Sequence, residues 1–432
     1  MSDVPARRIL VITYYYPPST ASGAHRWAAM VRHFRALGHE VWVVTSASTG
    51  VLSDDGERRV VRATDLVTSA SLRRILHRPA IARPGAAPTD TPAPALLTRV
   101  LVPDSHVLSW VPWAARAARA LVARERIECV ITSGPPDSTH LVALALGRRR
   151  PAWIADFRDG WTFQPLAASW PTAVQRRLDA RLERVVARRA ELTIGATRPI
   201  AEDLAARLGS SSHWISNGWD PALEGDVAAA SQMDLGGKAG WVTLVHTGTL
   251  SGAGGVGPRG RDPRPLLAAL GALNARAGDG GRRVRLVLAG RPAADDEELL
   301  AQAGLGEAVL HVGLLSRAAA VSLQRQADGL LLMTGNDSSE ATGKLFEYLA
   351  SGRPLIALAR DNEAARIVEA TGTGVVVAPG DEAAITAALQ ALLDSTLART
   401  YAPRDLDRFT YPGLARTALE LVEEAVAKHA RR

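Results

Sequence analysis

The sequence predicts an α/β protein built from two Rossmann-like, doubly wound domains that face a cleft. Strand-like and helix-like segments alternate in two successive series, the first over residues 8–208 and the second over 241–393. Loops of glycine and small polar residues follow several of the strand-like segments, and open α/β sheets bind ligands at that end of their strands. Residues 217–221 separate the two series, and their Asn-Gly and Asp-Pro pairs are typical of a loop.

The composition is that of a soluble globular protein with two or three domains, since 47% of the 432 residues are hydrophobic and 22% are charged. The single cysteine, Cys129, excludes a disulfide framework and fits a reducing cytoplasm. The chain shows neither a signal peptide nor a run of ~20 apolar residues that could span a bilayer. We therefore expect a cytoplasmic protein, either soluble or bound to the inner face of the cell membrane.

The positive charge is concentrated in the first half of the chain. Residues 1–220 contain 29 arginines and 19 acidic residues, a net charge of +10, whereas the remainder has a net charge of −3. Such a basic half suits an anionic surface or an anionic acceptor. An arginine-rich composition without a binding role is the alternative.

The first series opens with the apolar strand Arg8–Tyr14, followed by a loop and a helix that ends near Leu37. The loop lacks the Gly-x-Gly-x-x-Gly pattern of dinucleotide sites. Its Gly23 would let the backbone approach a ligand at the end of the strand, although a plain turn would also use glycine. Further on, residues 77–98 are rich in proline and alanine, which predicts a mobile loop.

A second strand of interest, Ala152–Ala155, leads directly into Asp156, Arg158 and Asp159. These charged residues form either a structural salt-bridge cluster or a catalytic group. In the catalytic interpretation, Asp159 accepts a proton from an acceptor hydroxyl, and Arg158 orients Asp159 or an anionic acceptor.

The helix predicted over Thr172–Arg189 is basic and amphipathic, with Leu178, Leu182 and Val185 as its apolar stripe. It is either a helix packed on the sheet with a solvated basic face or a helix that meets an anionic membrane surface.

In the second series, small polar residues at 338–343 lead into the helix-forming segment that starts at Lys344. The first N–H groups of a helix are unpaired and lie at the positive end of its dipole, so Thr342 and Gly343 are suited to hold a phosphate. Lys344 adds a cation there, and it is one of only three lysines among 51 basic residues.

Three segments of the chain resemble the retaining family 4 glycosyltransferases, in particular a bacterial branch. They are Lys-Leu-Phe-Glu-Tyr-Leu-Ala-Ser-Gly-Arg-Pro at 344–354, Ala-Asp-Phe-Arg-Asp-Gly-Trp at 155–161, and Thr-Gly-Thr-Leu at 247–250 with Gly-Arg-Asp-Pro at 260–263. The resemblance implies the GT-B fold, with the last helix crossing back to the first domain. It also implies metal-independent transfer of a sugar from a nucleotide diphosphate donor, UDP-linked by expectation, with retention at the anomeric carbon.

The same resemblance implies an acceptor domain at 1–218, joined by 408–432, and a donor domain at 219–407. Arg261 matches the basic residue that binds the donor diphosphate, with Arg259 as the alternative. Glu347 matches the acid that binds the ribose. The acid expected eight positions earlier falls on Ser339, one residue before Glu340, so either Glu340 reaches the donor sugar or Ser339 replaces the acid.

The implied site can be given as two sets. The expected catalytic residues are Arg158, Asp159, Arg261, Glu340 and Lys344. The expected donor-binding residues are Gly23, Arg26, Gly248, Thr249, Arg261, Gly290, His311, Gly313, Ser339, Glu340, Thr342, Gly343, Lys344, Leu345 and Glu347. No metal ion and no cofactor beyond the donor are expected.

Two other functions remain open on the same fold. One is a nucleotide-sugar epimerase or pseudo-glycosyltransferase, and the other is a nucleotide-sugar-binding protein without catalytic activity. The acceptor is also open, as either a lipid-linked or anionic glycan or a natural product. Nucleic acid is not expected, because the basic residues form no recognition motif and no aromatic platform.

Overall fold

The structure is a computed structural model. It describes residues 6–19, 21–50, 59–65, 103–104, 107–164, 170, 172–223, 240–251, 261–278 and 281–432. Residue contacts divide the chain into two compact units. Unit 1 comprises Met1–Ser216 together with Tyr411–Arg432, and unit 2 comprises Asn217–Thr410. The predicted loop at 77–98 and the alternative diphosphate ligand Arg259 lie outside the described residues.

Unit 1 is built on a parallel sheet with the strand order β3-β2-β1-β4-β5-β6-β7. Its strands are β1 (Arg8–Thr13), β2 (Glu40–Ser46), β3 (Val60–Ala63), β4 (Cys129–Gly134), β5 (Ala152–Phe157), β6 (Leu192–Gly195) and β7 (Ser212–Trp214). Its helices are α1 (Ser22–Ala36), α4 (Val111–Glu125), α5 (Ser138–Ala145), α6 (Ala173–Arg189), α7 (Arg198–Leu208) and α16 (Tyr411–Ala430).

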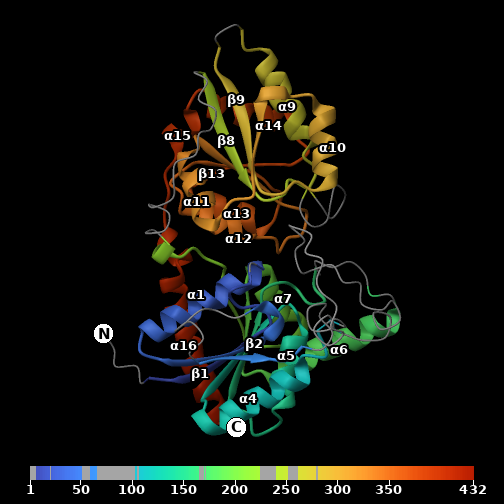
Figure 1. Cartoon of the computed structure of the whole chain (residues 1–432), viewed down its shortest axis with the longest axis vertical. Coiled ribbons are helices and arrows are strands. Elements are labelled where there is room, and N and C mark those ends of the chain that lie inside the picture. The colour runs from blue at the N-terminus through green and yellow to red at the C-terminus, as the bar shows by residue number, and fades with distance from the viewer. Residues whose placement is uncertain are drawn as a thin grey trace. The chain divides into compact units, whose positions relative to one another are not determined.

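Unit 2 repeats this arrangement with the strand order β10-β9-β8-β11-β12-β13, again parallel throughout. Its strands are β8 (Trp241–Thr247), β9 (Arg283–Ala289), β10 (Val309–Gly313), β11 (Gly329–Met333), β12 (Leu355–Leu358) and β13 (Gly374–Val377). Its helices are α9 (Arg264–Ala275), α10 (Ala294–Ala303), α11 (Arg317–Gln326), α12 (Gly343–Leu349), α13 (Glu363–Thr371), α14 (Glu382–Leu393) and α15 (Thr396–Thr400) (Figure 1).

Both sheets are therefore doubly wound, which confirms the predicted fold class. The direction of strand addition reverses between β1 and β4 in unit 1, and between β8 and β11 in unit 2. Ligands of such sheets bind beside the carboxyl ends of the two strands that flank this reversal. We therefore expect ligand sites at the loops that follow β1, β4, β8 and β11.

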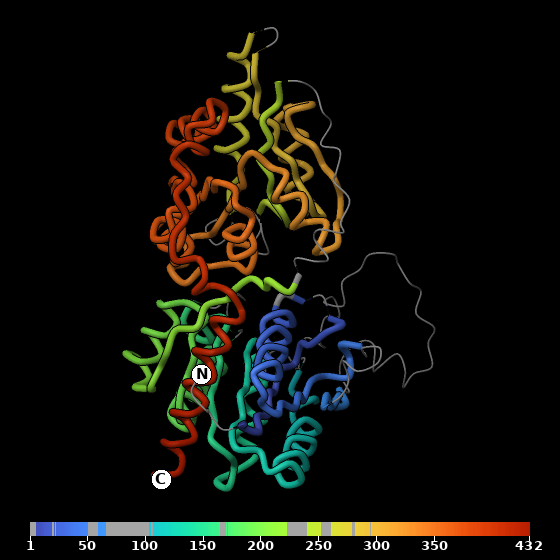
Figure 2. The backbone as a smooth tube through the Cα atoms, turned by 90° about the vertical axis from the view of Figure 1, so that its left-hand side faces the viewer, coloured from blue at the N-terminus to red at the C-terminus, as the bar shows by residue number. Residues whose placement is uncertain are grey.

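Each face of the unit 1 sheet carries its own apolar core, because buried parallel strands expose side chains to helices on both sides. One core joins Leu10, Ile12 and Trp153 to α4. The other joins Ile9 and Val11 to α1 and α16. The last helix, red in both views, thus covers the first sheet as predicted (Figures 1 and 2).

The orientation of α6 corrects the sequence prediction. Of its predicted apolar stripe, Leu182 packs against the core, whereas Leu178 is 45% exposed. The helix instead buries Gln175, Asp179 and Glu183 together with Val186. These carboxylates accept hydrogen bonds from outside the helix, Asp179 from the indole of Trp161 and Glu183 from Arg207, which offsets part of the cost of burying them.

Within the described residues, no helix is both long enough and apolar enough to cross a bilayer.

Candidate active site

Lys344, the second residue of α12, lies against the end of β8 in unit 2. Its Nζ donates a hydrogen bond of 2.6 Å to the Thr247 carbonyl and lies 3.4 Å from Nε2 of His246. Gly248 makes this approach possible, because a Cβ atom there would stand 2.8 Å from Nζ. Its φ of +101° is also a conformation that L residues rarely adopt. Gly248 is therefore needed both for the turn after β8 and for the space that Lys344 occupies.

The environment of Lys344 makes its charge easy to remove. Burial lowers its pKa to about 7, and the positive charge of Arg261 adds to this effect, while Glu340 and Glu347 oppose it. His246 takes no part of that charge, because burial, with Lys344 nearby, lowers its own pKa to about 3. An anion that binds beside Lys344 therefore stabilises its charged form.

Arg261 and Glu340 form an ion pair at the same site. The distance from Nη2 of Arg261 to Oε1 of Glu340 is 2.9 Å, and the other carboxylate oxygen accepts the N–H of Gly335. Glu340, which lies 79 positions after Arg261 in the sequence, thus holds the guanidinium group of Arg261 in place. From there the charge of Arg261 acts on Lys344. Ser339, the alternative to Glu340, lies half-buried in the turn just before it.

Glu347 lies one turn along α12 and is held by a residue that the sequence analysis missed. Arg317, the first residue of α11, pairs with Oε1 of Glu347 at 2.9 Å. Next along α12, the hydroxyl of Tyr348 accepts the N–H of Thr247 at 2.9 Å and so fixes the end of β8. Tyr348 could have been identified from the sequence, because it follows Glu347 in the motif at 344–354. Arg317 lies in no motif.

The start of α12 contains an unsatisfied polar group. Oγ1 of Thr342, the residue before the helix, is buried and has no hydrogen-bond partner within the described part of the chain. Gly343 is exposed beside it, whereas Leu345 is fully buried in the core and can offer a ligand only its backbone. Because buried hydroxyl groups usually have a hydrogen-bond partner, Oγ1 of Thr342 is suited to bind a polar group of a ligand.

A small recess next to this cluster brings the remaining unit 2 residues together. Gly290 donates its N–H to the carbonyl of Gly313, and a Cβ atom on Gly290 would meet the backbone of Gly248 at 3.0 Å. The carbonyl of Thr249 lies 3.0 Å from Nε2 of His246. Asp296 closes the recess by accepting the N–H groups of Leu250 and Ser251. The lining residues are Gly248, Leu250, Leu288, Gly290, Pro292, Asp296, Leu300 and His311.

In unit 1, Arg158 lies across the carboxyl ends of β4 and β5. Its Nε donates to the Gly134 carbonyl at 3.0 Å, and its Nη2 donates to the carbonyl of Pro135. The third nitrogen faces the first turn of α1, where a Cβ atom on Gly23 would overlap the guanidinium group. Gly23 thus makes room for the side chain of Arg158, and its predicted approach to a ligand stays a prediction.

Asp159 follows Arg158 and is half-buried. Burial raises its pKa, and the neighbouring charge of Arg158 limits that rise. A carboxylate with a raised pKa is a stronger base than one in water. Asp137, in the loop after β4, has a pKa raised well above its usual value by burial and by the negative charges of Asp104 and other acids around it. This part of unit 1 therefore carries acidic as well as basic side chains.

Arg26 and Asp156 have a structural role in unit 1. Both are almost fully buried, and Nη2 of Arg26 lies 3.0 Å from Oδ1 of Asp156. The other oxygen of Asp156 accepts from Trp27 at 2.7 Å and from Ser133 at 2.8 Å. Arg26 also donates to the carbonyl of Ile215 at 2.8 Å. These contacts hold the two terminal nitrogens of Arg26 inside unit 1, and the proposed donor site is built without it.

Comparison with known proteins gives a consistent picture. A family model described as "Glycosyltransferase Family 4" matches residues 23–223, and one described as "Glycosyl transferases group 1" matches residues 259–395. No curated protein matches the chain by sequence.

Solved structures share the fold at low sequence identity. Sucrose-phosphate synthase from Thermosynechococcus elongatus is 17% identical, with a TM-score of 0.65 over 98% of this chain and 99% of that one. The α,α-trehalose 6-phosphate synthase from Burkholderia multivorans is 14% identical, with a TM-score of 0.62 over 99% of both chains. UDP-GlcNAc 2-epimerase from Methanocaldococcus jannaschii is 9% identical, with a TM-score of 0.53 over 96% of this chain and 99% of that one.

Proposed function

Because the chain is a family 4-like glycosyltransferase with the GT-B fold, we propose that it transfers a sugar from a nucleotide diphosphate donor, UDP-linked by expectation, to an acceptor hydroxyl. We propose further that the anomeric configuration is retained and that no metal ion is needed. Unit 2 binds the donor and unit 1 binds the acceptor in this scheme.

The observation that carries the proposal is the pair of cations in unit 2. Lys344 and Arg261 are held at one site by Thr247 and Glu340, beside the unsatisfied hydroxyl of Thr342. When the bond from the anomeric carbon to the diphosphate oxygen breaks, the electron pair stays on the diphosphate and its negative charge grows. Fixed cations stabilise that charge more in the transition state than in the bound donor, which accelerates the step. They supply the charge that a divalent ion supplies in other enzymes.

The rest of the donor fits around this pair. Glu347, oriented by Arg317, is the proposed acceptor of hydrogen bonds from the ribose hydroxyls. The recess at Gly290 and His311 is the proposed place of the base. Glu340 both positions Arg261 and is the proposed contact to the donor sugar.

Lys344→Gln tests this proposal. We expect turnover with a UDP-sugar to fall by ~10²–10³-fold, the scale seen when one group that stabilises a developing anion is removed. Arg353→Gln is the matched control, since Arg353 follows the same helix and donates to the carbonyl of Arg325. Product analysis by NMR reports the anomeric configuration. An inverted product, or equal loss in both variants, would contradict the scheme.

The acceptor hydroxyl needs a base, and we propose Asp159. Its raised pKa fits that role, and the cation of Arg158 beside it suits an anionic acceptor. Two of the fold neighbours, sucrose-phosphate synthase and trehalose 6-phosphate synthase, are named for phosphorylated sugars. The acceptor class nonetheless stays between an anionic or lipid-linked glycan and a natural product.

Asp159→Asn keeps the size of this side chain and removes its basicity. We expect kcat to fall by ~10²–10⁴-fold, the usual contribution of a general base, while the Kd for the donor stays unchanged. Steady-state kinetics with titration of the donor separates the two. Unchanged kcat and acceptor KM would remove Asp159 from the mechanism.

A second candidate, an epimerase acting on the donor itself, is favoured by one observation, the fold shared with UDP-GlcNAc 2-epimerase. Incubation with a donor labelled in its sugar distinguishes the two functions. Label in a new glycoside supports transfer, and an isomerised nucleotide sugar formed without an acceptor supports epimerisation.

A further inference from the structure

The helix α6 buries two acidic side chains beside its buried apolar residues, Val186 and Ala187. Its acidic residues, Asp179 and Glu183, point into unit 1 and are nearly fully buried. Asp179 accepts indole N–H groups from Trp161 and Trp170, and Glu183 binds Arg207 at 2.8 Å. The outward side of the helix therefore carries no carboxylate of its own.

The outward face carries apolar side chains instead. Val174 is 62% exposed and Leu178 is 45% exposed, and Val185 lies on the same side two turns further on. On a helix, positions spaced by 4, 7 and 11 residues from Val174 form one stripe, so Arg181 falls between Leu178 and Val185. Apolar side chains on an exposed stripe stay in contact with water unless another surface covers them.

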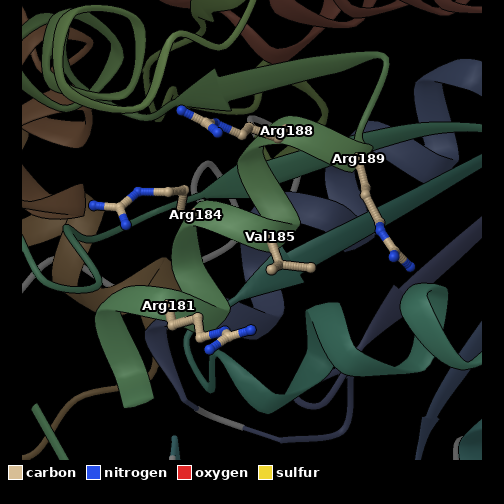
Figure 3. A pocket seen from close by; sticks show the side chains of 5 residues that line it. All are labelled: Arg181, Arg184, Val185, Arg188 and Arg189. Carbon is tan, nitrogen blue, oxygen red and sulfur yellow. The ribbon is translucent and has the colours of Figure 1, made fainter. Parts of the chain in front are cut away.

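Arginines surround this stripe. Figure 3 shows four of them around Val185, lining a shallow hollow and pointing in different directions. The exposed arginines on this side of the helix are Arg177, Arg181, Arg184, Arg188 and Arg189. Across the part of the chain that the structure describes, none of the five forms an ion pair, and Nε of Arg188 reaches only the Leu208 carbonyl, at 3.5 Å. We call these arginines with Val174, Leu178 and Val185 the basic-apolar face.

Such a face fits a charged surface with an apolar interior beneath it. Soluble polyanions would pair with the guanidinium groups but would leave Val174 and Leu178 in water. A purely apolar partner would leave the guanidinium groups without an anion to pair with. At a bilayer, Arg side chains reach the headgroup phosphates while the shorter apolar side chains enter the acyl boundary.

We propose that the basic-apolar face of α6 binds the surface of a membrane containing anionic lipids. The proposal stands apart from the sugar transfer proposed above, because none of the residues of this face belongs to the donor or acceptor site. Its test therefore uses binding alone.

The test is co-sedimentation of the full chain with vesicles. We expect binding to vesicles of phosphatidylcholine with phosphatidylglycerol at about 50 mM salt, and much weaker binding at about 500 mM, where charges are screened beyond a few ångströms. Binding to vesicles of phosphatidylcholine alone should be near background. Equal binding to both vesicle types, or none to anionic vesicles at low salt, would overturn the proposal.

Two sets of variants assign the binding to α6. Replacing Arg181, Arg184 and Arg188 together with Gln should weaken binding by about a hundredfold, since each arginine near an anionic surface contributes roughly a factor of five. The matched control replaces Arg116, Arg124 and Arg126 of the α4 region with Gln, which removes the same charge from exposed positions and should leave most of the binding. An equal loss in both sets would mean that overall charge, not α6, is responsible.

Leu178→Gln separates a membrane from a soluble polyanion. It should weaken vesicle binding about tenfold without any change of charge, because an apolar side chain no longer enters the lipid. Binding to heparin, measured in parallel, should not respond to this substitution and should be weaker than binding to vesicles. Vesicle binding that is insensitive to Leu178→Gln would identify a polyanion site instead. Circular dichroism and thermal unfolding of each variant check that the protein stays folded.

Discussion

Lys344 is the residue on whose protonation the proposed donor site depends most. Its pKa is lowered to about 7, so in the free protein it loses its proton as the pH rises through neutrality. A bound diphosphate favours the charged form, so the pKa in the complex is higher than in the free protein. Donor binding above pH 7 must then take up a proton, and affinity should fall as the pH rises.

This predicts a Kd for a UDP-sugar that is constant below about pH 6 and rises above pH 7, by at most tenfold per pH unit. Calorimetric titrations in buffers of different ionisation enthalpy measure both the Kd and the proton uptake. UDP-sugars suit the experiment because their diphosphate has no group that titrates in this range. The slope should vanish in Lys344→Gln, and a slope of wild-type size in that variant would assign it to another group.

Gly248 is the second residue with a separable role. In Gly248→Ala, the added Cβ atom would be 2.8 Å from Nζ of Lys344 and the φ of +101° would be strained. Gly352→Ala is matched in strain, with a φ of +73°, but meets nothing within 4 Å. Both variants should lose about 1–2 kcal/mol of stability. Only Gly248→Ala should also lower donor affinity, by more than about tenfold if Lys344 is displaced.

Thermal unfolding and donor titration of the two variants measure these effects separately. Equal donor affinity in Gly248→Ala and the wild type would show that Lys344 moves aside without consequence, and the Lys344 assignment would then weaken.

The helix α16 joins the apolar core of unit 1 although it follows the whole of unit 2 in the sequence. Leu421 is 6% exposed and belongs to the core shared with α1 and β1. Leu421→Ala should lower the free energy of unfolding of unit 1 by about 2–4 kcal/mol, because it leaves a cavity. Glu420→Ala, one residue earlier and exposed, should change it by less than about 0.5 kcal/mol.

Urea denaturation followed by tryptophan fluorescence is a suitable measurement, since eight of the ten tryptophans lie in residues 1–216. If Leu421→Ala were as stable as Glu420→Ala, α16 would not be part of the cooperative core.

The packing of α6 could not be predicted from the sequence pattern of the helix alone. Leu178, Leu182 and Val185 have helical spacing, which predicts a packed stripe, yet only Leu182 packs against the core. The helix also buries Asp179 and Glu183. The reason is the indole and guanidinium donors supplied from other segments. Those donors make buried carboxylates acceptable, and no periodicity within α6 reveals them.

At the scale of the whole molecule, the fold could be predicted and the contacts within the site could not. Strands such as β1 and β8 are apolar runs that a local window detects, and loops after strands are natural sites. The pair of Arg317 with Glu347 spans 30 positions, and that of Tyr348 with Thr247 spans 101. Sequence motifs named Glu347 and Lys344, but the residues that hold and neutralise them come from other elements.

The return of α16 to unit 1 also bears on how the protein is made. The apolar face formed by Ile9, Val11 and Met30 is covered by Leu414, Ala418 and Val422, yet all of residues 217–410 are synthesised between these two groups. Domains usually fold in the order of their synthesis. Here the first unit is completed last, so on the ribosome the part of its sheet that α16 covers stays exposed while the second unit folds. Chaperone dependence during translation should therefore be set by unit 1, although it leaves the ribosome first.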